Sequence, residues 1–152
     1  MKWLVNWFSN MEEFDDLMYH NGIYYRTVEH FFQAMKFKDI EHRKRIAAMP
    51  SPFDAKREGR QCRDLIVKDW DKIKQSAMWT ALKWKFREET RWGKILKSTG
   101  DMDIVEWNNW HDNYWGWCVC ERCTNNRIED PKNKLGKMLM GIRLTYKSEE
   151  RY

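Results

Sequence analysis

Apolar and polar residues alternate near the start of the chain in the way expected of a hairpin. Two apolar runs, Leu17–Tyr19 and Ile23–Tyr25, flank the segment His20–Gly22. This segment contains Asn followed by Gly, and Asn-Gly between apolar runs is typical of a tight turn between antiparallel strands. We therefore expect two short strands there.

A helix is predicted directly after this hairpin. Thr27 is a suitable N-cap residue, because its hydroxyl can accept a hydrogen bond from the first helical turn. Apolar residues then recur at spacings of three and four, at Val28, Phe31, Phe32 and Met35. This spacing predicts a helix over the segment VEHFFQAMKF, with one apolar face.

Further helical segments follow the same logic. They are expected at Glu41–Met49, from a cap at Ser51 to a stop at Gly59, at about Asp69–Glu88, and after a cap at Asn133. A short turn at Lys94–Ser98 closed by Gly100, a short strand at Met102–Trp107 and a loop at Asn108–Asp130 separate the last two. The predicted fold class is mainly α, a compact helical fold with a small N-terminal hairpin and a few short strands.

Length and hydropathy limit the kinds of protein that this chain can be. Its 152 residues fit one domain, which we expect to span residues 1–152. No apolar run approaches the roughly 18 residues that suggest a membrane span. Acidic residues soon follow the short N-terminal apolar stretch, unlike a secretory signal. We expect a cytoplasmic protein without membrane association, while the oligomeric state stays open.

Charge and aromatic content favour an anionic, ring-containing partner. The formal net charge is +5, which favours phosphate or nucleic acid without specifying either. Ten tryptophans and an aromatic fraction of 15% exceed what one small core can hold, so some rings should line a site. For any single tryptophan, packing in the core is the commoner role.

Three polar residues fall on one flank of the predicted VEHFFQAMKF helix. At about 100° per residue, Glu29, Gln33 and Lys36 lie together beside the apolar stripe. Partial desolvation there would raise the carboxylate pKa toward that of a general acid or base, while the lysine opposes the shift or binds phosphate. The alternative from periodicity alone is a solvated Glu and Lys on an exposed helix edge.

A second candidate site is the segment EWNNWHDNYWG, which lacks regular periodicity. It brings together Glu106, His111, Asp112, Trp115 and Gly116. Loops that combine acids and rings in this way often form binding sites. The alternative is a surface loop held in place by buried tryptophans.

The cysteines are arranged unevenly, which argues against a disulfide framework. Cys62 stands alone, and Cys118, Cys120 and Cys123 lie in the segment CVCERC. Three thiols within six residues, with His111 upstream as a candidate fourth ligand, allow zinc. Structural zinc sites, however, usually pair two separated two-ligand units. We therefore favour reduced cysteines in a loop and expect no metal or cofactor.

Several motifs, in order and spacing over nearly the whole chain, resemble the NADAR family, also called YbiA-like. The VEHxFQ helix followed by xxWG and NxLGxxLMxxR is the most specific part of the resemblance. The matching segments are WFSN at Trp7–Asn10, TVEHFFQAMKF at Thr27–Phe37, DW at Asp69–Trp70, KF at Lys85–Phe86, STGD at Ser98–Asp101, DNYWG at Asp112–Gly116 and NKLGKMLMGIR at Asn133–Arg143.

The resemblance implies a compact, mainly helical fold and an N-glycosidase activity on ribosyl-linked substrates. These are phosphoribosyl intermediates of riboflavin synthesis or ADP-ribosyl adducts, including ADP-ribosylated guanine in DNA or RNA. By position, the resemblance assigns Glu29 to the VEH carboxylate, Trp70 to the DW ring, Asp112 and Trp115 to the acid and ring before the glycine, and Asn133 and Arg143 to the closing motif. After Gly116 the chain departs from the enterobacterial pattern, with a longer, cysteine-bearing segment in place of a glycine-rich acidic loop.

These assignments give a hypothesis for the site. Glu29 stabilises the positive charge that develops on the sugar and takes a proton from water, while Asp112 orients the water or a ribose hydroxyl. The other predicted substrate-binding side chains are Trp70 or Trp115 for stacking, Lys36 or Arg143 for phosphate, and Gln33 and Asn133. The rivals are a non-catalytic module that binds ADP-ribose or nucleic acid, and a small zinc-dependent nucleic-acid binder.

Overall fold

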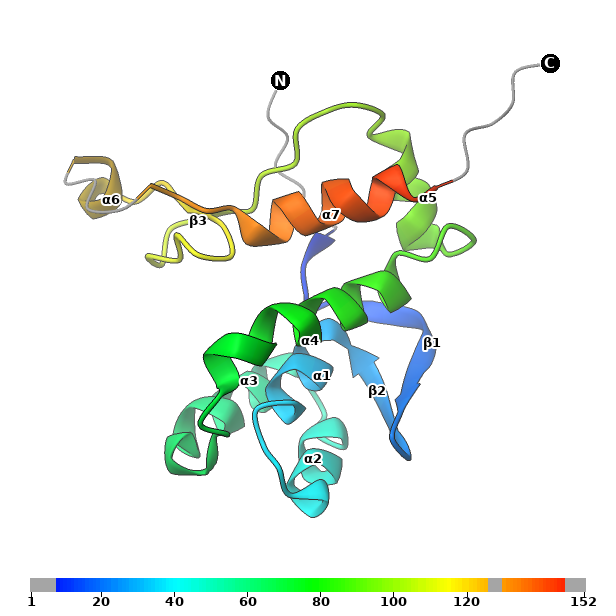
Figure 1. Cartoon of the computed structure of the whole chain (residues 1–152), viewed down its shortest axis with the longest axis vertical. Coiled ribbons are helices and arrows are strands. Elements are labelled where there is room, and N and C mark those ends of the chain that lie inside the picture. Colours follow the sequence, from blue (N-terminus) through cyan, green and yellow to red (C-terminus); the bar gives the residue numbers. More distant parts are fainter. Residues whose placement is uncertain (1–7, 126–129, 147–152) are drawn as a thin grey trace. The chain divides into compact units, whose positions relative to one another are not determined.

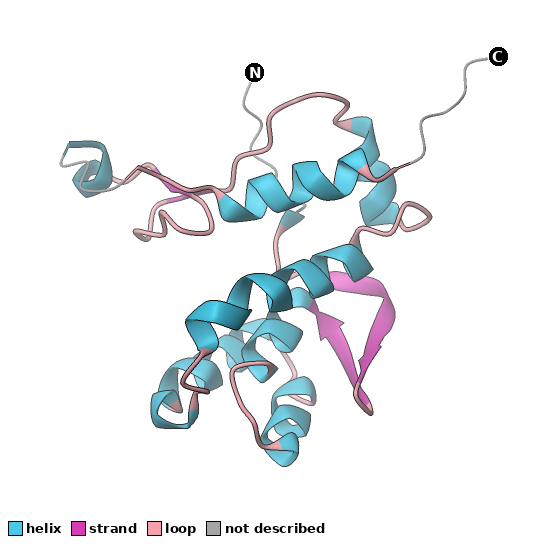
Figure 2. Ribbon diagram, viewed as in Figure 1, coloured by secondary structure: helices cyan, strands magenta, loops and turns pink. Residues whose placement is uncertain are grey.

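Helices make up most of the secondary structure. The computed structural model describes residues 8–125 and 130–146. Within these ranges it contains seven α-helices, a 3-10 turn at Arg63–Leu65 and two sheets of two strands each (Figures 1 and 2). The mainly α fold class is thus confirmed. The described residues group into two compact units, residues 8–92 and residues from 93 onward, and we describe each by itself.

The first unit begins with the predicted hairpin. Strands β1 (Glu13–His20) and β2 (Ile23–Thr27) pair antiparallel, as the magenta arrows in Figure 2 show. Asn21 and Gly22 form the turn with positive φ angles of 48° and 83°. This left-handed pair of residues gives the turn a twist that matches that of the strands, so the hairpin prediction is confirmed.

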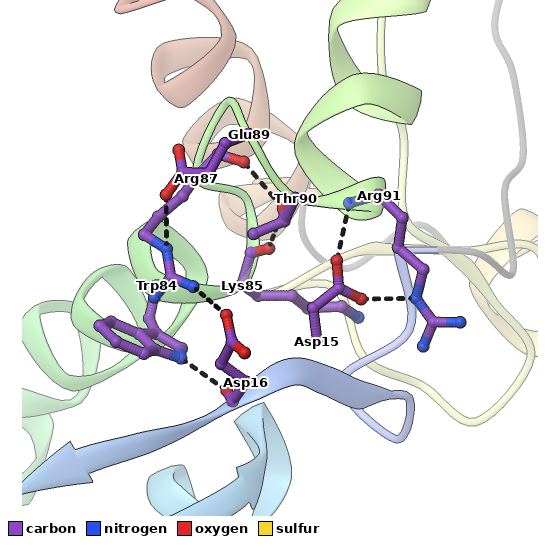
Figure 3. Close-up of polar contacts among 8 residues, drawn as sticks. All are labelled: Asp15, Asp16, Trp84, Lys85, Arg87, Glu89, Thr90 and Arg91. Atoms are coloured by element: carbon purple, nitrogen blue, oxygen red, sulfur yellow. Dashed lines mark hydrogen bonds and ion pairs between the residues drawn. The ribbon is translucent and has the colours of Figure 1, made fainter.

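Two carboxylates from an irregular stretch of β1 bind arginines that follow a helix. The register of the hairpin shifts between Glu13 and Met18. Side chains in this stretch reach the end of α4 (Trp70–Lys85) and the residues that follow it (Figure 3). The Asp16 carboxylate pairs with Arg87, and the Asp15 carboxylate pairs with Arg91. The indole Nε1 of Trp84 donates to the backbone carbonyl of Asp16. They hold β1 against the C-terminal end of α4.

Helix α1 (Val28–Ala34) is the central element of this unit. All of its residues are buried. It contacts β2, α2 (Ile40–Ala47), α3 (Pro52–Gln61) and α4. The predicted apolar stripe is present, but α1 ends three residues before the expected helix does. Its polar side chains are therefore enclosed by other elements.

The start of α1 is fixed by a pair of side chains that satisfy each other. Thr27 caps the helix as predicted, because its Oγ1 accepts from the backbone N of His30 at 3.1 Å. His30 Nδ1 lies 2.8 Å from the same hydroxyl, and His30 Nε2 lies 3.0 Å from the carbonyl oxygen of Met49. A carbonyl only accepts, so Nε2 carries the proton and Nδ1 accepts from Thr27. His30 is a structural residue.

The segment before β1 is held by backbone contacts to two helices. The backbone N–H of Glu29, unpaired within its own first helical turn, donates to the carbonyl of Asn10 at 3.1 Å. The buried ammonium group of Lys85 donates to the carbonyl of Ser9 at 2.6 Å. Phe8 packs edge-on against Phe86. The described part of the WFSN motif therefore fastens this segment beside α1, while Trp7 lies outside the described residues.

Gly59 does not end α3, contrary to the prediction. The helix starts as predicted, with Ser51 accepting from the backbone N of Asp54, but it continues through Gly59 to Gln61. A Cβ atom at Gly59 would lie deep inside van der Waals contact with Oε1 of Gln33. The glycine thus allows α3 to approach α1 closely, and this requirement arises from a residue far away in the sequence.

The second unit has short elements joined by long connections. It contains most of α5 (Arg91–Ser98), strands β3 (Trp107–Asn108) and β4 (Trp117–Cys118), α6 (Glu121–Asn125) and α7 (Lys134–Leu144). The two strands are parallel. The strand predicted at Met102–Trp107 is wrong except at its last residue, and the predicted loop contains β4 and α6.

Asn133 stands before α7, yet its side chain does not cap that helix. Its Oδ1 accepts from the backbone N of Glu106 at 3.0 Å, and its Nδ2 donates to the carbonyl of Ile104 at 2.9 Å. The capping prediction is therefore wrong: the amide links the helix start to a distant extended segment. Gly136 permits this approach, because a Cβ there would collide with the Ile104 carbonyl and the Asn133 amide.

None of the helices in the described ranges combines the length and the apolar character that crossing a membrane requires.

Replacing Gly59 by alanine tests the close approach of α3 to α1. Gly59→Ala should lower the free energy of unfolding by about 1–3 kcal/mol, because the new methyl group collides with Gln33. In a Gln33→Ala background the same substitution should instead be neutral or stabilising by up to about 1 kcal/mol, since alanine favours helix. Urea unfolding of the four proteins measures both effects, and an equal loss in the two backgrounds would contradict the contact.

Candidate active site

Glu29 is a buried carboxyl group at the second position of α1. The residue is only 5% exposed. Burial raises the pKa of Glu29 above its ordinary value, because the charged form loses its water. Four neighbours oppose this effect by favouring the carboxylate, namely the Gln33 hydrogen bond and the positive charges of Lys56, Lys36 and Arg60.

Gln33 lies one helical turn after Glu29 and binds it directly. Its Nε2 donates to Oε1 of Glu29 at 2.6 Å, and the residue is 4% exposed. Because a carboxylate accepts, the amide nitrogen must face Glu29 and the amide oxygen must face Gly59. Among the described residues, no hydrogen-bond donor reaches that oxygen. Gln33 therefore orients the carboxylate and leaves a buried acceptor beside it.

Lys36 lies just beyond α1, in a turn, whereas the sequence predicted that it belongs to the helix. Its backbone N donates to the carbonyl of Gln33, and its carbonyl accepts from Val67 at 2.9 Å. Burial lowers the pKa of Lys36, and the Glu29 carboxylate opposes this shift. The sequence thus places Lys36 correctly near Glu29, although the side chain leaves from a turn and not from the helix.

Two aromatic rings border this lysine. Trp70, the first residue of α4, packs against Phe32 with ring centroids 5.0 Å apart at an interplanar angle of 62°. The Nζ atom of Lys36 lies 5.7 Å from the Phe32 centroid and 5.9 Å from that of Trp70. Trp70 as a whole is half-buried. These rings give the charged group an apolar wall.

Helix α3 supplies two cations that the sequence reasoning missed. The charges of Lys56 and Arg60 lower the pKa of Glu29 and also that of Lys36, so both stand near the two buried groups. The two residues are four apart and therefore share a face of α3, and Gly59 adjoins Arg60. Their spacing was readable in the sequence, but only the packing of α3 on α1 directs that face toward Glu29.

Asn10 is a second residue that was missed. Its carbonyl accepts from the backbone N of Glu29, and its side-chain amide donates to the sulfur of Met78 at 3.7 Å. The Oδ1 atom of Asn10 is buried and, among the described residues, finds no hydrogen-bond partner. Buried acceptors without partners are rare in folded proteins. Asn10 and Gln33 therefore each leave one buried acceptor without a partner among the described residues.

The arrangement around Glu29 suits chemistry on a polar, anionic substrate. Because burial raises the pKa of Glu29, this carboxyl group is a better proton acceptor than an ordinary one when ionised. The cations Lys36, Lys56 and Arg60 can attract phosphate, and the ring of Trp70 can stack on a planar group. Strongly perturbed carboxyl groups of this kind are typical of functional sites.

The predicted site residues of the second unit have well-defined local contacts. Asp112 Oδ1 accepts from the backbone N of Tyr114 at 3.0 Å and from that of Trp115 at 2.8 Å. The half-buried Trp115 ring packs edge-on against Tyr114. Asp112 therefore shapes the turn that carries Trp115. The catalytic role of Asp112 and the substrate contact of Trp115 stay predictions.

Asn133 and Arg143 also bind their own unit. The oxygen and the nitrogen of the Asn133 side-chain amide both bind backbone groups, as described above. Arg143 Nη1 donates to Thr99 Oγ1 at 2.6 Å and to the carbonyl of Met102 at 2.8 Å. These bonds tie α7 to the connection after α5. The predicted substrate contacts of Asn133 and Arg143 stay predictions.

Two groups of side chains among the described residues have ligand atoms close enough for a metal ion. One comprises His42, Glu58 and Cys62. There Glu58 pairs with Arg45 and with His42, so an ion pair already accounts for the cluster. The other comprises His111, Cys118, Cys120 and Cys123.

The comparisons with known proteins agree with one another. The model of the NADAR domain family matches residues 1–146. "N-glycosidase YbiA" of Escherichia coli (strain K12) is 30% identical over 147 residues, which cover 92% of this chain and 86% of that protein. "N-glycosidase Npun_R5314" of Nostoc punctiforme is 36% identical over 123 residues, which cover 79% and 73% of the two chains.

A solved structure and a longer relative extend the match. The NMR structure of the E. coli protein YbiA superposes with a TM-score of 0.74 and 28% identity, over 99% of this chain and 90% of that one. "Riboflavin biosynthesis protein PYRR, chloroplastic" of Zea mays is 32% identical over 135 residues, which are only 20% of its length. With the family model matched over nearly the whole sequence, the chain belongs to the NADAR domain family.

Proposed function

We propose that this chain, an N-glycosidase of the NADAR family, hydrolyses the C–N bond between a ribosyl carbon and a base in a phosphorylated substrate, with Glu29 as the catalytic carboxylate. The observation that carries the proposal is the buried Glu29 side chain, held by Gln33 and surrounded by three cations. The names of the relatives from E. coli and N. punctiforme support the reaction class.

The chemistry of this reaction needs a carboxylate in such a place. As the C–N bond breaks, its electron pair leaves with the base and positive charge develops on the sugar. An ionised Glu29 stabilises that charge, and its effect is larger in a buried site than in water. It then accepts a proton from the water whose hydroxide joins the sugar carbon, and the departing base takes up a proton in turn.

The cations explain why the substrate should carry phosphate. Lys36, Lys56 and Arg60 outnumber the carboxylate that they surround. This excess of positive charge attracts an anion into the site and binds it by charge-assisted hydrogen bonds. Trp70, a half-buried residue beside Lys36, has a ring suited to stack on the base or on the ribose.

Two substrate classes share this chemistry. One is ADP-ribosylated guanine in nucleic acid, or a related ADP-ribosyl adduct, and the other is a phosphoribosyl intermediate of riboflavin synthesis. Relatives named riboflavin biosynthesis proteins, in Zea mays and in Vibrio vulnificus, support the second class. The net charge of +5 suits a substrate carried on nucleic acid and supports the first. A cytoplasmic location stays a prediction.

A binding module for ADP-ribose is the alternative function. It would use the same cations and the same ring, but it would not need a buried carboxyl group. Burying Glu29 costs free energy, and a module that only binds an anion would place this negative charge against its own ligand. The carboxylate therefore favours catalysis over binding alone.

Loss of the Glu29 charge should lower the rate of the reaction strongly without unfolding the protein. Glu29→Gln keeps an oxygen that accepts from Gln33, and it should lower kcat/KM by about 10²- to 10⁴-fold, the usual contribution of a general base. Incubation with DNA bearing ADP-ribosyl guanine and with phosphoribosyl aminopyrimidine, followed by mass spectrometry of the released products, measures the rate for each substrate class.

The exposed residue Glu41 provides the matched control. Glu41→Gln removes the same charge from another helix of the same unit and should leave both rates unchanged. A folded Glu29→Gln protein that releases product at the parental rate would show that Glu29 is not the catalytic carboxylate. Binding of ADP-ribose without release of either product by the parental protein would favour the binding module.

The raised pKa of Glu29 has a defined consequence for pH dependence. Because the ionised form is the reactive one, kcat/KM should rise with pH through a midpoint above the ordinary value of 4.5. For stability the sign is opposite: a raised pKa means that the folded state favours the protonated form, so stability falls as pH increases through that pKa.

Two measurements check this. A rate profile from about pH 4 to pH 8 should show the acid limb in the parental protein. Urea unfolding measures the free energy of unfolding of both proteins. The value for Glu29→Gln minus the value for the parental protein should increase from acid to neutral pH. An acid limb at or below the ordinary value, with no pH dependence of this difference, would contradict a desolvated carboxyl group.

Removing the Lys36 charge should weaken substrate binding more than turnover. Lys36→Gln should raise KM by about 10- to 100-fold, as expected for loss of a hydrogen bond to a charged group, with a smaller change in kcat. Lys38→Gln, at an exposed position two residues away, is the control and should have no such effect. An unchanged KM for Lys36→Gln would argue against a phosphate contact by this residue.

A further inference from the structure

Three side chains from the connection between β3 and α6, and a fourth from α6 itself, converge on one point. The ligand atoms of His111, Cys118, Cys120 and Cys123 all lie within 4.8 Å of one another. None of the three thiols forms a disulfide. The parallel pairing of β3 with β4 explains the convergence, because it brings the loop after β3 beside the end of β4, where Cys118 lies.

The distances between these atoms suit a tetrahedral ion. His111 Nδ1 lies 3.2 Å from Cys120 Sγ and 3.6 Å from Cys123 Sγ. In a tetrahedral zinc site, bonds of about 2.3 Å to sulfur and about 2.0–2.1 Å to nitrogen place the ligand atoms about 3.5–3.8 Å apart. Slight adjustment of the side chains therefore gives each ligand its normal bond length.

The sulfur atoms accept an unusual number of hydrogen bonds. Cys118 Sγ accepts from the backbone N of His111 at 3.3 Å and from that of Cys120 at 3.5 Å. Cys120 Sγ accepts from the backbone N of Cys123 at 3.4 Å. A neutral thiol is a weak acceptor, whereas a thiolate attracts such donors strongly. The backbone is arranged to stabilise negative charge on sulfur.

Asn113 supports the group from outside. Its Nδ2 donates to Cys123 Sγ at 3.4 Å, and its Oδ1 accepts from the backbone N of Cys118 at 2.9 Å. One side chain thus orients two of the cysteines. Side chains that orient metal ligands in this way typically influence metal affinity strongly.

The backbone at His111 is the last element of the site. His111 has a φ of 68°, in the left-handed region that histidine adopts more readily than most residues other than glycine. This conformation lets the backbone N–H of His111 face Cys118 while its ring faces Cys120 and Cys123. The local strain is offset when both groups are engaged.

We propose that His111, Cys118, Cys120 and Cys123 bind a structural zinc ion. Three thiolates and one imidazole are a common ligand set for structural zinc, and four protein ligands leave no position for substrate. The sequence reasoning favoured metal-free cysteines because CVCERC lacks a distant second pair. The structure brings the candidate fourth ligand, His111, to the three cysteines.

The ion has a clear structural task. The connection from β3 to α6 includes few hydrogen-bonded strand residues, and its ends are held together by the proposed ligands. Zinc would fix this connection, including the turn of Asp112 and Trp115. If these two residues have the substrate roles that the sequence predicts, zinc sets their geometry; the metal site itself does not depend on the proposed function.

Elemental analysis of the purified full chain tests the proposal directly. We expect about one equivalent of zinc per chain in the parental protein and in Cys62→Ser, whose cysteine lies outside the group. Cys120→Ser should lose the zinc. Reconstitution with Co²⁺ alone should give the intense visible absorption of a tetrahedral thiolate site in the parental protein and not in Cys120→Ser.

A second set of measurements tests the proposal even if Cys120→Ser fails to fold. In the parental protein, the three clustered thiols should resist a thiol reagent until a chelator is added, while Cys62 should react without it. Asn113→Ala should keep all four ligands but bind zinc about 10- to 100-fold more weakly in competition with a chromogenic chelator. Glycosidase rates of these proteins, measured separately, report on the proposed function without entering the metal assay.

Three results would overturn the zinc site. The first is parental protein without zinc that also gives no tetrahedral Co²⁺ spectrum. The second is retention of full zinc by Cys120→Ser, and the third is a disulfide between any two of the clustered cysteines in protein purified without oxidant. Loss of zinc with the cysteine variant and weakening with Asn113→Ala would together support zinc binding at this group of side chains.

Discussion

The hydrogen bond from Gln33 to Glu29 is the interaction around which the first unit is organised. A carboxyl group in the interior is costly unless polar partners and charges surround it. Gln33 provides the partner from the next turn of α1, and α3 provides cations. Helix α3 can do so only because Gly59 lets its backbone approach the Gln33 amide. The packing of two helices and the charge balance of the candidate site thus depend on the same contact.

Local signals allowed much of this fold to be predicted. Asn21–Gly22 determine their own turn, and Thr27 and Ser51 cap the helices that they precede, because the groups involved lie within a few residues. Gly59 and Asn133 were misassigned for the opposite reason. Their partners, Gln33 and the Ile104–Glu106 segment, are more than 25 positions away. Periodicity contains no information about such contacts.

In the candidate site, too, contacts between neighbours in the sequence were predictable and contacts between distant segments were not. The helical wheel correctly put Gln33 beside Glu29, since a spacing of four places residues on one face. It could not find Asn10, Lys56 or Arg60, which approach from other segments. In the second unit, side-chain amides form hydrogen bonds with backbone groups of the connections between elements. The amides are those of Asn108, Asn113 and Asn133. These three amides therefore have structural contacts that their positions in the sequence do not reveal.

Glu29 and His30 are neighbours in α1, yet protons affect them in opposite ways. Burial lowers the pKa of His30, whose neutral ring links Thr27 to Met49, so acid weakens the start of the helix as the pH falls below the ordinary value of 6.5. The same acid neutralises Glu29 and removes the cost of its burial. Acid therefore affects the stability of this helix in opposite directions at these two residues. A protein built in this way can lose activity in acid while it stays folded.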